Sequence, residues 1–331
     1  MRSQPVEVAV LLFLGVTVGS APFPAGSGRG GSQVVVFGAT PAGIGAALSA
    51  AKYGNAVTLV DLQRHVGGMM SGGLGWDDVD CSYCPTASPA GVPSRAVYGT
   101  SVYRQFAARV RAHYAAVSER ALELSVNGTR HEPHVAEQIL LAMLTERNVS
   151  VRLGLRLTGV SVLGGRIRSL MVQPVNMADS SRLPPQTITG HAFIDASYEG
   201  DLLAQAGAPW TVGREGRTEY GELNAGVVFQ DNVKKSFLRG STGDASHAVP
   251  AMTWRLCFST TANRKLMTAP PTNYNRSLYL GYLEDVSENR IKSVWNAWSG
   301  PRPLPPDGSK YDINCNPRPL GFIWAGGRKD E

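Results

Sequence analysis

The segment Gly38-Ala-Thr-Pro-Ala-Gly43 has a glycine spacing that could bind the diphosphate of a nucleotide. In such a tight turn, backbone N–H groups and the positive end of the following helix meet the phosphate charge. The pattern departs from G-x-G-x-x-G because Thr40 stands where a second glycine would let a ligand approach the backbone closely. Glycine also packs a helix closely on a strand, so this motif alone leaves a purely structural role open.

Asp61 ends the next apolar run, where a carboxylate can accept hydrogen bonds from both ribose hydroxyls of an adenosine. Without the glycines, an acid at a strand end would be read as an ordinary surface residue. Its position after the glycine turn favours the ribose-binding role, and the two features together predict a dinucleotide site.

A doubled glycine follows this acid closely, in the segment Arg64-His-Val-Gly67-Gly68-Met69. A nicotinamide dinucleotide has no particular need of such a loop, because it crosses the edge of the sheet and leaves. A flavin dinucleotide runs back past the loop, and glycines let the backbone come within contact distance of its pyrophosphate and ring. The doubled glycine therefore favours FAD over NAD, with a flexible loop as the structural alternative.

The elements that carry these residues form one β-α-β unit. Residues 33–37 are an apolar run typical of a buried strand, and Pro41 suits the first turn of the helix that we expect over residues 42–53. Gly54 suits a helix cap, and residues 56–60 are a second buried strand that ends in the acid. The unit implies a parallel sheet.

The rest of the chain alternates helical and strand patterns before it becomes irregular. The expected helices are residues 94–119, 134–147 and 201–206, and the expected strands are residues 149–153, 155–163, 166–172 and 191–195. A two-residue hairpin turn is predicted at Gly164-Gly165. We therefore expect an α/β fold with a Rossmann-like, FAD-binding domain that has a parallel sheet and a β-hairpin insertion, followed by a second, incomplete substrate-side region. Their bounds are residues 33–226 and 227–331.

The N-terminus has the order of a secretory signal peptide: a basic residue, an apolar run over residues 8–18 and small residues up to Ala21. Glu7 and Pro22 fit that interpretation less well, and a buried helix or a membrane anchor is the alternative. No later segment is apolar and long enough to cross a membrane. We expect a signal peptide over residues 1–21, a linker over residues 22–32, and a secreted protein.

The cysteines and glycosylation sequons are compatible with a secreted protein. Sequons begin at Asn127, Asn148 and Asn275, and the four cysteines fit an oxidising compartment. Cys81 and Cys84 form a C-x-x-C among turn residues, without the second ligand pair of a zinc site or the strand that precedes a thioredoxin-like motif. We expect a loop disulfide or free thiols there, and no metal site.

The composition favours a globular protein that acts on a small molecule. The chain has 331 residues, of which 43% are hydrophobic, with a formal net charge of +6 and a pI of about 9.2. This is enough apolar material for a large core, and it argues against a disordered or fibrous protein. The arginines are scattered, so the positive charge assists an anionic ligand and does not indicate a nucleic-acid surface. The oligomeric state stays open.

Several stretches together resemble the FAD-dependent oxidoreductases of the xanthan-lyase-associated type, within the glutathione-reductase-like flavoprotein group. The resemblance covers residues 33–226 and is specific. It is carried by VVVFGATPAGIGAALSAAKYGNAVTLVD, RHVGGMMSGGLGWDD, HEPHVAEQILLAML and FIDASYEGDLLAQAGAPWTVGRE.

The resemblance implies a set of FAD-binding residues. Gly38, Pro41, Ala42 and Gly43 would face the pyrophosphate and Asp61 the adenosine ribose, and Thr40 and Leu62 are expected to bind the cofactor as well. Those along the cofactor toward the flavin would be Arg64, Gly67, Gly68 and Met69. The backbone of Leu157 would hold adenine, and Asp195 would begin a second strand-end contact. The segment from Tyr311 to Asn314 is similar to a substrate-side motif of the family.

The resemblance ends before the chain does. In the family, a C-terminal strand and helix return to the flavin, and the residues after Asn316 do not resemble them. We therefore expect a truncated chain, and a non-catalytic secreted flavoprotein fragment is one alternative function. An NAD-dependent dehydrogenase is the other.

For the complete enzyme, we expect hydride transfer from a C–H bond of a small organic substrate to the flavin. The family association suggests a carbohydrate, but no motif identifies it. Candidates for the base that accepts the proton are His65, His134 and Tyr198, none of which the sequence selects as catalytic. Covalent attachment of FAD through His65 is a further alternative.

Overall fold

The computed structural model describes residues 33–76, 100–175, 183–231, 236–237, 239–249, 257–262, 269–270, 272, 274–280, 287 and 302–312. Outside these residues lie the expected signal peptide and linker, the pair Cys81 and Cys84, and the expected start of the helix at residue 94.

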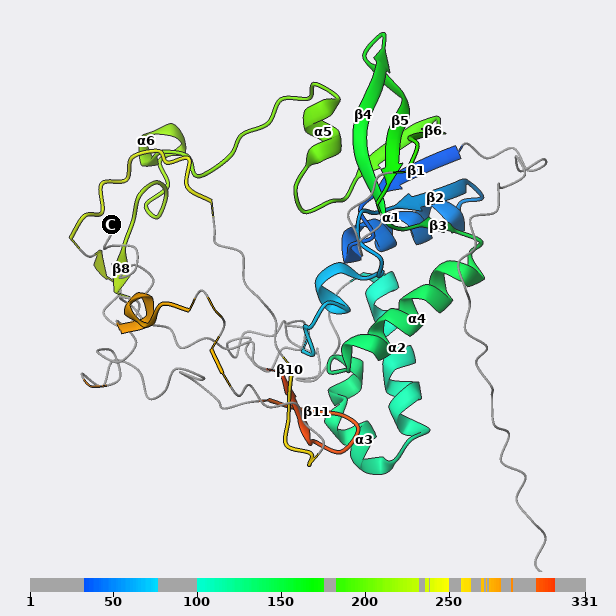
Figure 1. The fold of residues 1–331 in the computed structure, drawn as a ribbon, viewed down its shortest axis with the longest axis vertical. Coiled ribbons are helices and arrows are strands. Elements are labelled where there is room, and N and C mark those ends of the chain that lie inside the picture. Colours follow the sequence, from blue (N-terminus) through cyan, green and yellow to red (C-terminus); the bar gives the residue numbers. More distant parts are fainter. Residues whose placement is uncertain are drawn as a thin grey trace, which may run out of the picture.

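A parallel sheet with the strand order β3-β2-β1-β7 forms the centre of the fold (Figure 1). Its strands are β1 (Gln33–Phe37), β2 (Ala56–Val60), β3 (Ser150–Arg152) and β7 (Ala192–Asp195). Phe37 at the end of β1 is level with Val60 of β2 on one side and with Asp195 of β7 on the other. The predicted β-α-β unit is confirmed, and the carboxyl ends of these strands meet at one edge of the sheet.

Helix α1 (Pro41–Lys52) lies on one face of the parallel sheet, and α2 (Ser101–Ala115) and α4 (Pro133–Glu146) pack against α1 in the same core (Figure 1). Val34 and Val36 of β1 belong to the core on this side, because alternate residues of a strand face opposite sides. The buried side chains that share this core include Ile44, Ala47 and Leu48 of α1, Phe106 and Val110 of α2, and Leu140 and Leu144 of α4.

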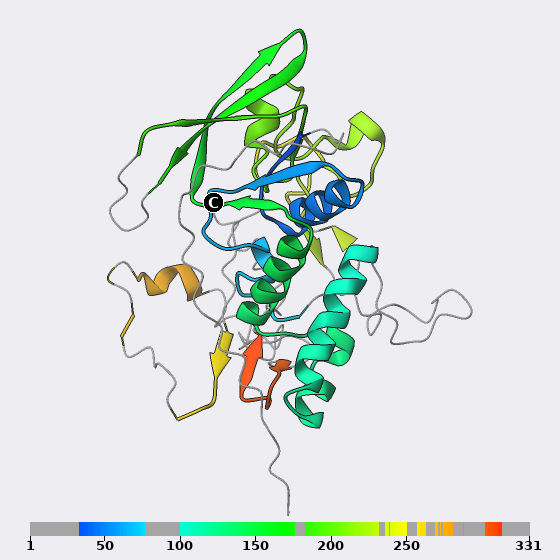
Figure 2. The ribbon, with the colours of Figure 1, turned by 90° about the vertical axis from the view of Figure 1, so that its right-hand side faces the viewer.

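An antiparallel sheet covers the other face of the parallel sheet (Figure 2). Its strands are β4 (Leu155–Leu163), β5 (Arg166–Pro174) and β6 (Gln186–Thr189). Val35 and Phe37 of β1 lie in the core on this side, with Leu170 and Val172 of β5. Because both faces of β1 are covered, its sequence is a continuous apolar run. The hairpin predicted at Gly164-Gly165 is confirmed by the pairing of β4 with β5.

Two elements differ from their predictions. The helix expected to reach residue 119 ends at Ala115, because Ser118 is extended and its hydroxyl accepts a hydrogen bond from Ala121 N at 3.0 Å. Ser118 thereby caps a separate helix, α3 (Glu119–Leu124). Strand β7 was expected to be buried, but Ala192 is exposed and the other β7 residues are half-buried, because β7 lies at the edge of the parallel sheet.

The remaining elements are short. They are α5 (Asp201–Gln205), α6 (Arg217–Tyr220), β8 (Gln230–Asp231), β9 (Ser236–Phe237), β10 (Cys257–Ser259), β11 (Arg302–Leu304), β12 (Lys310–Asp312) and the 3-10 helices η1 (Gly68–Met70), η3 (Val126–Gly128) and η4 (Arg276–Tyr279). Backbone hydrogen bonds of 2.8 Å join Arg214 to Ser246 and Val227 to Asp244. The domain division expected after residue 226 stays a prediction.

Strand β12 contacts both the helical layer and the loop that follows the doubled glycine. Gly75 N donates to the Asp312 carboxylate at 3.3 Å, and the Lys310 ammonium pairs with the Glu132 carboxylate. Glu132 is buried, and its backbone N–H donates to the Tyr114 hydroxyl at 2.9 Å. Burial raises the pKa of Tyr114 well above its usual value. These contacts fix β12 against α2, α4 and the Gly75 loop.

Candidate cofactor site

Thr40 caps helix α1 and ties it to the end of β7. Its hydroxyl accepts a hydrogen bond from Gly43 N at 3.2 Å and donates one to Ala196 O at 2.7 Å. The side chain is almost fully buried. Thr40 therefore points into the protein. Although it replaces the second glycine of the motif, its side chain does not block the approach of a ligand to the backbone of the turn.

Gly38 and Gly43 are required by the packing of the turn itself. A Cβ on Gly43 would lie 1.8 Å from Gly38 O, and a Cβ on Gly38 would lie 2.6 Å from the backbone of Ala196 and Ser197. Gly38 also has a left-handed φ of +106°. The two glycines let the turn, the helix and the strand end approach one another, whether or not a ligand is bound.

The turn presents backbone donors at the start of α1. Within the described residues, the N–H groups of Thr40 and Ala42 form no hydrogen bond, and Pro41 has none to offer. Pro41 and Ala42 are exposed and carry small side chains. Free N–H groups beside the positive end of a helix are the donor set that a diphosphate requires, so the turn fits the pyrophosphate of FAD.

Asp61 lies directly against this turn. One carboxylate oxygen accepts from Ala39 N at 2.5 Å, and the other accepts from Gln63 N at 2.7 Å. Each oxygen of a carboxylate has two lone pairs, so each keeps one for a further donor. The half-buried Asp61 therefore fits the ribose hydroxyls while it also holds the turn.

The doubled-glycine loop bonds to Ala39, the residue whose N–H donates to Asp61. Gly67 N donates to Ala39 O at 2.8 Å, so Ala39 is bonded both to Asp61 and to Gly67. Gly67 and Gly68 have left-handed φ values of +109° and +50°. The turn, the acid and the doubled glycine, which are separate in sequence, are thus adjacent in space. Sequence reasoning missed Ala39, because a residue that acts through its backbone leaves no signal in its side-chain type.

Met69 and His65 lie on this loop. Met69 is exposed, and its backbone N–H donates to the Tyr198 hydroxyl at 3.0 Å. The His65 Nε2 lies 3.4 Å from Gly68 O, so its ring faces the loop. His134, the third candidate base with His65 and Tyr198, is an exposed residue in the first turn of α4.

Arg64 and the backbone of Asp61 contact the two ends of the β4–β5 hairpin. The Arg64 guanidinium donates to Val175 O at 3.0 Å, next to the base of the hairpin. Leu155 N donates to Asp61 O at 2.9 Å, which joins the start of β4 to the acid. Leu157 follows on the same strand with a buried side chain, and Leu62 is half-buried beside Asp61. The adenine-binding role of the Leu157 backbone stays a prediction.

Asp195 organises the turn after β7. One carboxylate oxygen accepts from Ser197 N at 3.0 Å and Ser197 Oγ at 2.7 Å, and the other accepts from Leu203 N at 2.9 Å. These bonds fix the turn to α5, so the carboxylate has a structural role. The backbone of Ala196, and not the Asp195 side chain, touches the glycine turn.

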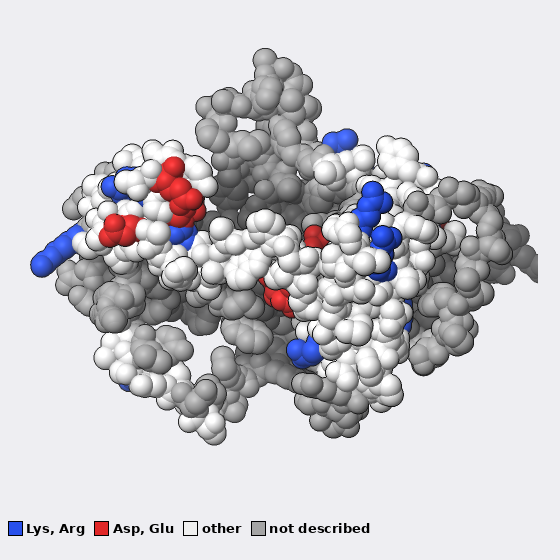
Figure 3. Space-filling model, turned by 90° about the horizontal axis from the view of Figure 1, so that it is seen from above, with Lys and Arg blue, Asp and Glu red and all other residues white. Residues whose placement is uncertain are grey.

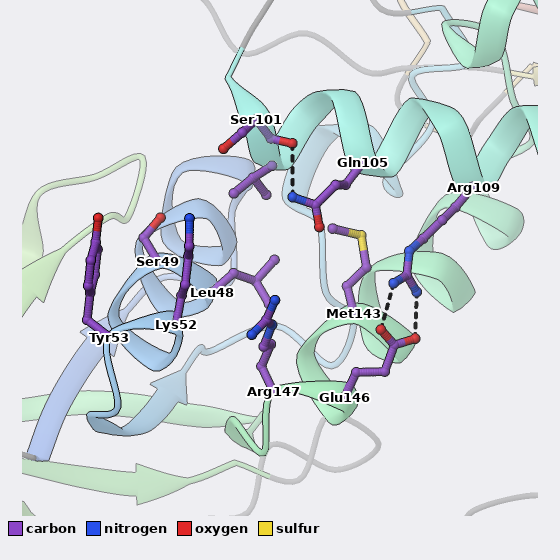
Figure 4. Close-up of a pocket in the computed structure, with 11 residues that line it drawn as sticks. Leu48, Ser49, Lys52, Tyr53, Ser101, Gln105, Arg109, Met143, Glu146 and Arg147 are labelled. Carbon is purple, nitrogen blue, oxygen red and sulfur yellow. Dashed lines mark hydrogen bonds and ion pairs between the residues drawn. The ribbon is translucent and has the colours of Figure 1, made fainter.

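The basic side chains and the hollow on the described surface do not mark the position of this site. Lys and Arg side chains appear as separate groups on the face drawn in Figure 3. A hollow of about 280 Å³ lies at the C-terminal end of α1, lined by Lys52, Met143 and the ion pair of Arg109 with Glu146 (Figure 4). A 12-residue helix is about 18 Å long, so this hollow lies far from the glycine turn and is not the cofactor site.

Comparison with known families identifies the group to which the chain is related. The model of the family described as "FAD dependent oxidoreductase" matches residues 33–323. The chain belongs to this family. Both the α/β fold and FAD as the cofactor, predicted from the sequence, agree with membership of the FAD-dependent oxidoreductases. The finer assignment to a xanthan-lyase-associated or glutathione-reductase-like subgroup is not tested by this match.

Solved structures similar to this FAD-dependent oxidoreductase include a glycerol-3-phosphate dehydrogenase from Bacillus halodurans complexed with FAD. Its sequence identity to this chain is 12% and the TM-score is 0.34, and the match covers 54% of this chain and 37% of that one. An L-amino acid deaminase from Proteus vulgaris has 14% identity and a TM-score of 0.35, with 60% and 54% covered. An L-proline dehydrogenase from P. horikoshii has 12% identity and a TM-score of 0.32, with 56% and 58% covered. The chain thus spans between 37% and 58% of these proteins. No curated protein matches it.

Two absences hold for the part of the chain that the structure describes. None of their helices combines the length and the apolar character needed to cross a bilayer. No group of three or more His, Cys, Asp or Glu side chains is placed to hold a metal ion.

Proposed function

We propose that this chain binds FAD across the start of α1 and that the whole protein oxidises a small organic substrate by hydride transfer to the flavin. The observation that carries the proposal is the pair of bonds at Ala39, which brings the glycine turn, Asp61 and Gly67 together. A dinucleotide needs donors for its diphosphate close to an acceptor for its ribose. Family membership favours FAD over the nicotinamide alternative.

Each part of the site has a separate task in this proposal. The N–H groups of Thr40 and Ala42 would bind the pyrophosphate, and Asp61 would accept from the ribose hydroxyls. Gly67, Gly68 and Met69 would line the path toward the flavin. Bound FAD supplies the hydride-accepting ring, while the protein positions the substrate and takes up the proton.

The proton acceptor would be one of the groups that face the doubled-glycine loop. His65 and Tyr198 lie at this loop, whereas His134 is exposed on α4. We therefore favour His65 or Tyr198 over His134. A carbohydrate substrate and the xanthan-lyase-associated subgroup are proposed from the sequence stretches that resemble that subgroup.

Secretion and N-glycosylation are also part of the proposal. The side chains of Asn127, Asn148 and Asn275 are exposed, as glycosylation requires. Expression in a secreting eukaryotic cell should give a protein in the medium that begins near residue 22 and loses mass on glycosidase treatment. Retention of the unprocessed chain inside the cell would overturn this part.

The cofactor proposal is tested by FAD titration of the wild type and of two variants at Ala42. Ala42→Glu places a negative charge at the start of α1, where it favours the helix dipole but repels a diphosphate. Near a protein surface, like charges about 4 Å apart repel by several kcal/mol, so we expect FAD binding to weaken at least tenfold. Ala42→Gln is the matched control and should bind nearly as well as the wild type.

Wild-type protein that is folded but binds no FAD would contradict the proposal. Binding of NAD in the place of FAD would instead support the nicotinamide alternative. Equal FAD affinity of the Glu and Gln variants would show that the pyrophosphate lies elsewhere.

A further inference from the structure

Tyr198 lies on the doubled-glycine loop, although it belongs to the turn after β7. Its hydroxyl accepts a hydrogen bond from Met69 N at 3.0 Å. A Cβ on Gly68 would lie 2.4 Å from this hydroxyl, so the phenol fills the notch that a side chain at Gly68 would occupy. The absence of a side chain at Gly68 is therefore explained by Tyr198.

The backbone that carries Tyr198 is held from several sides. Ala196 N donates to Phe37 O at 2.8 Å, and Thr40 donates to Ala196 O at 2.7 Å. Ser197 N, next to Tyr198, donates to the Asp195 carboxylate, and Gly200 N donates to Ser197 Oγ at 3.0 Å. The sheet and the glycine turn therefore hold the backbone that positions the Tyr198 phenol.

Most of the Tyr198 side chain is nevertheless open to a ligand, because the residue is 62% exposed. It stands beside the loop that Gly67 joins to Ala39, at the point where a dinucleotide that leaves the turn would pass. Aromatic rings in such a position bind flat, conjugated groups by stacking, and a phenol can also donate a hydrogen bond.

We propose that Tyr198 contacts the flavin half of FAD and that its hydroxyl holds the Met69 loop in the conformation that receives this half. The inference rests on the proposed FAD site and adds a contact residue to it. The adenosine half is bound by Asp61 and the glycine turn, so Tyr198 should distinguish FAD from ADP, which lacks the flavin half.

The experiment measures the affinities for FAD and for ADP of the full chain and its variants. Tyr198→Ala should weaken FAD binding about tenfold, the size of one aromatic stacking contact, and leave ADP binding within about twofold. Tyr198→Phe keeps the ring and loses the acceptor for Met69 N, so FAD binding should weaken a few-fold. Tyr53→Ala is the matched control, because Tyr53 is 81% exposed at the opposite end of α1.

The outcomes separate this inference from the proposed function. Wild-type binding of FAD and ADP, with unchanged FAD affinity in Tyr198→Ala, would overturn the role of Tyr198 and leave the FAD site standing. An equal loss of FAD and ADP affinity would place Tyr198 among the supports of the glycine turn and would also overturn it. Wild-type protein that binds neither ligand would overturn both proposals.

Discussion

The carboxylate of Asp61 accepts a hydrogen bond from the backbone N–H of Ala39 at 2.5 Å. The acid at the end of β2 therefore stabilises the turn at the end of β1, in addition to any contact with a ribose. A carboxylate that already accepts protein N–H groups is held in place before a ligand arrives, which lowers the entropy cost of binding.

This double role makes Asp61 sensitive to a neutral replacement. Asp61→Asn removes the charge and turns an amide N–H₂ toward Ala39 N or Gln63 N. Hydrogen bonds to charged groups contribute about 1.5–3 kcal/mol, so we expect both FAD and ADP to bind about tenfold more weakly. Isothermal titration gives both affinities. Glu119→Gln, an exposed replacement on α3, should leave them unchanged, and unchanged affinities in Asp61→Asn would refute the role of the acid.

Two glycines of α1 should respond in opposite ways to alanine. Gly43→Ala places a Cβ 1.8 Å from Gly38 O, so we expect a loss of several kcal/mol in the free energy of unfolding or no folded protein. Gly45→Ala meets no atom within 4 Å in the interior of α1, so we expect a gain of roughly 0.5–1 kcal/mol. Urea denaturation measures both. Equal effects of the two substitutions would contradict the packing described for the turn.

The stability of the chain should fall at alkaline pH through Tyr114. Burial raises the pKa of Tyr114 above its usual value of 10.0, so the folded chain keeps this proton to a higher pH than the unfolded chain. The contribution of protonated Tyr114 to the free energy of unfolding is fully present below pH 10.0. It is lost as the pH rises above that value, by up to about 1.4 kcal/mol per pH unit.

Tyr114→Phe removes this titration together with the hydrogen bonds to Glu132. At about pH 8 the variant should be less stable than the wild type by about 1–2 kcal/mol, because buried partners lose their bonds. The difference should shrink by about pH 11, as the wild type loses its advantage. Urea denaturation at the two pH values checks this, and a constant difference would be evidence against a titrating Tyr114.

The pair of Lys310 and Glu132 should show strong coupling. Lys310→Met leaves the Glu132 carboxylate, whose side chain is 8% exposed, without its cation, and we expect a loss of roughly 1–3 kcal/mol in unfolding free energy. Adding Glu132→Gln to this variant should restore part of the loss, because no buried charge then remains. A double-mutant cycle in urea measures the coupling, and strictly additive losses would argue against the ion pair.

The sequence predicted the central unit well because its signals are local. The apolar run of β1, the glycine turn and the cap at Gly54 each act within a few residues, and β1 and β2 have the expected bounds. The end of α2 was misplaced because the extended Ser118 interrupts a periodic pattern that continues on both sides of it. The exposure of β7 depends on its place at the sheet edge, which the sequence of one strand does not contain.

The sequence names candidate residues of the site but not the contacts between them. Glycines were expected to make room for a ligand, yet the empty positions at Gly43 and Gly68 are filled by Gly38 O and the Tyr198 hydroxyl. Such contacts join segments far apart in the chain, such as Gly68 and Tyr198. Neither spacing nor composition records which segments meet, so these neighbours could not be derived before the fold was known.

The loop that starts at Gly67 is attached at both ends: its first residue to Ala39 in the nucleotide turn, and Gly75 to Asp312 near the far end of the described chain. A ligand that orders this loop on binding to the turn would therefore also favour the docking of β12. Because such a coupling is reciprocal, a docked β12 would raise the affinity of the turn for the ligand by the same factor.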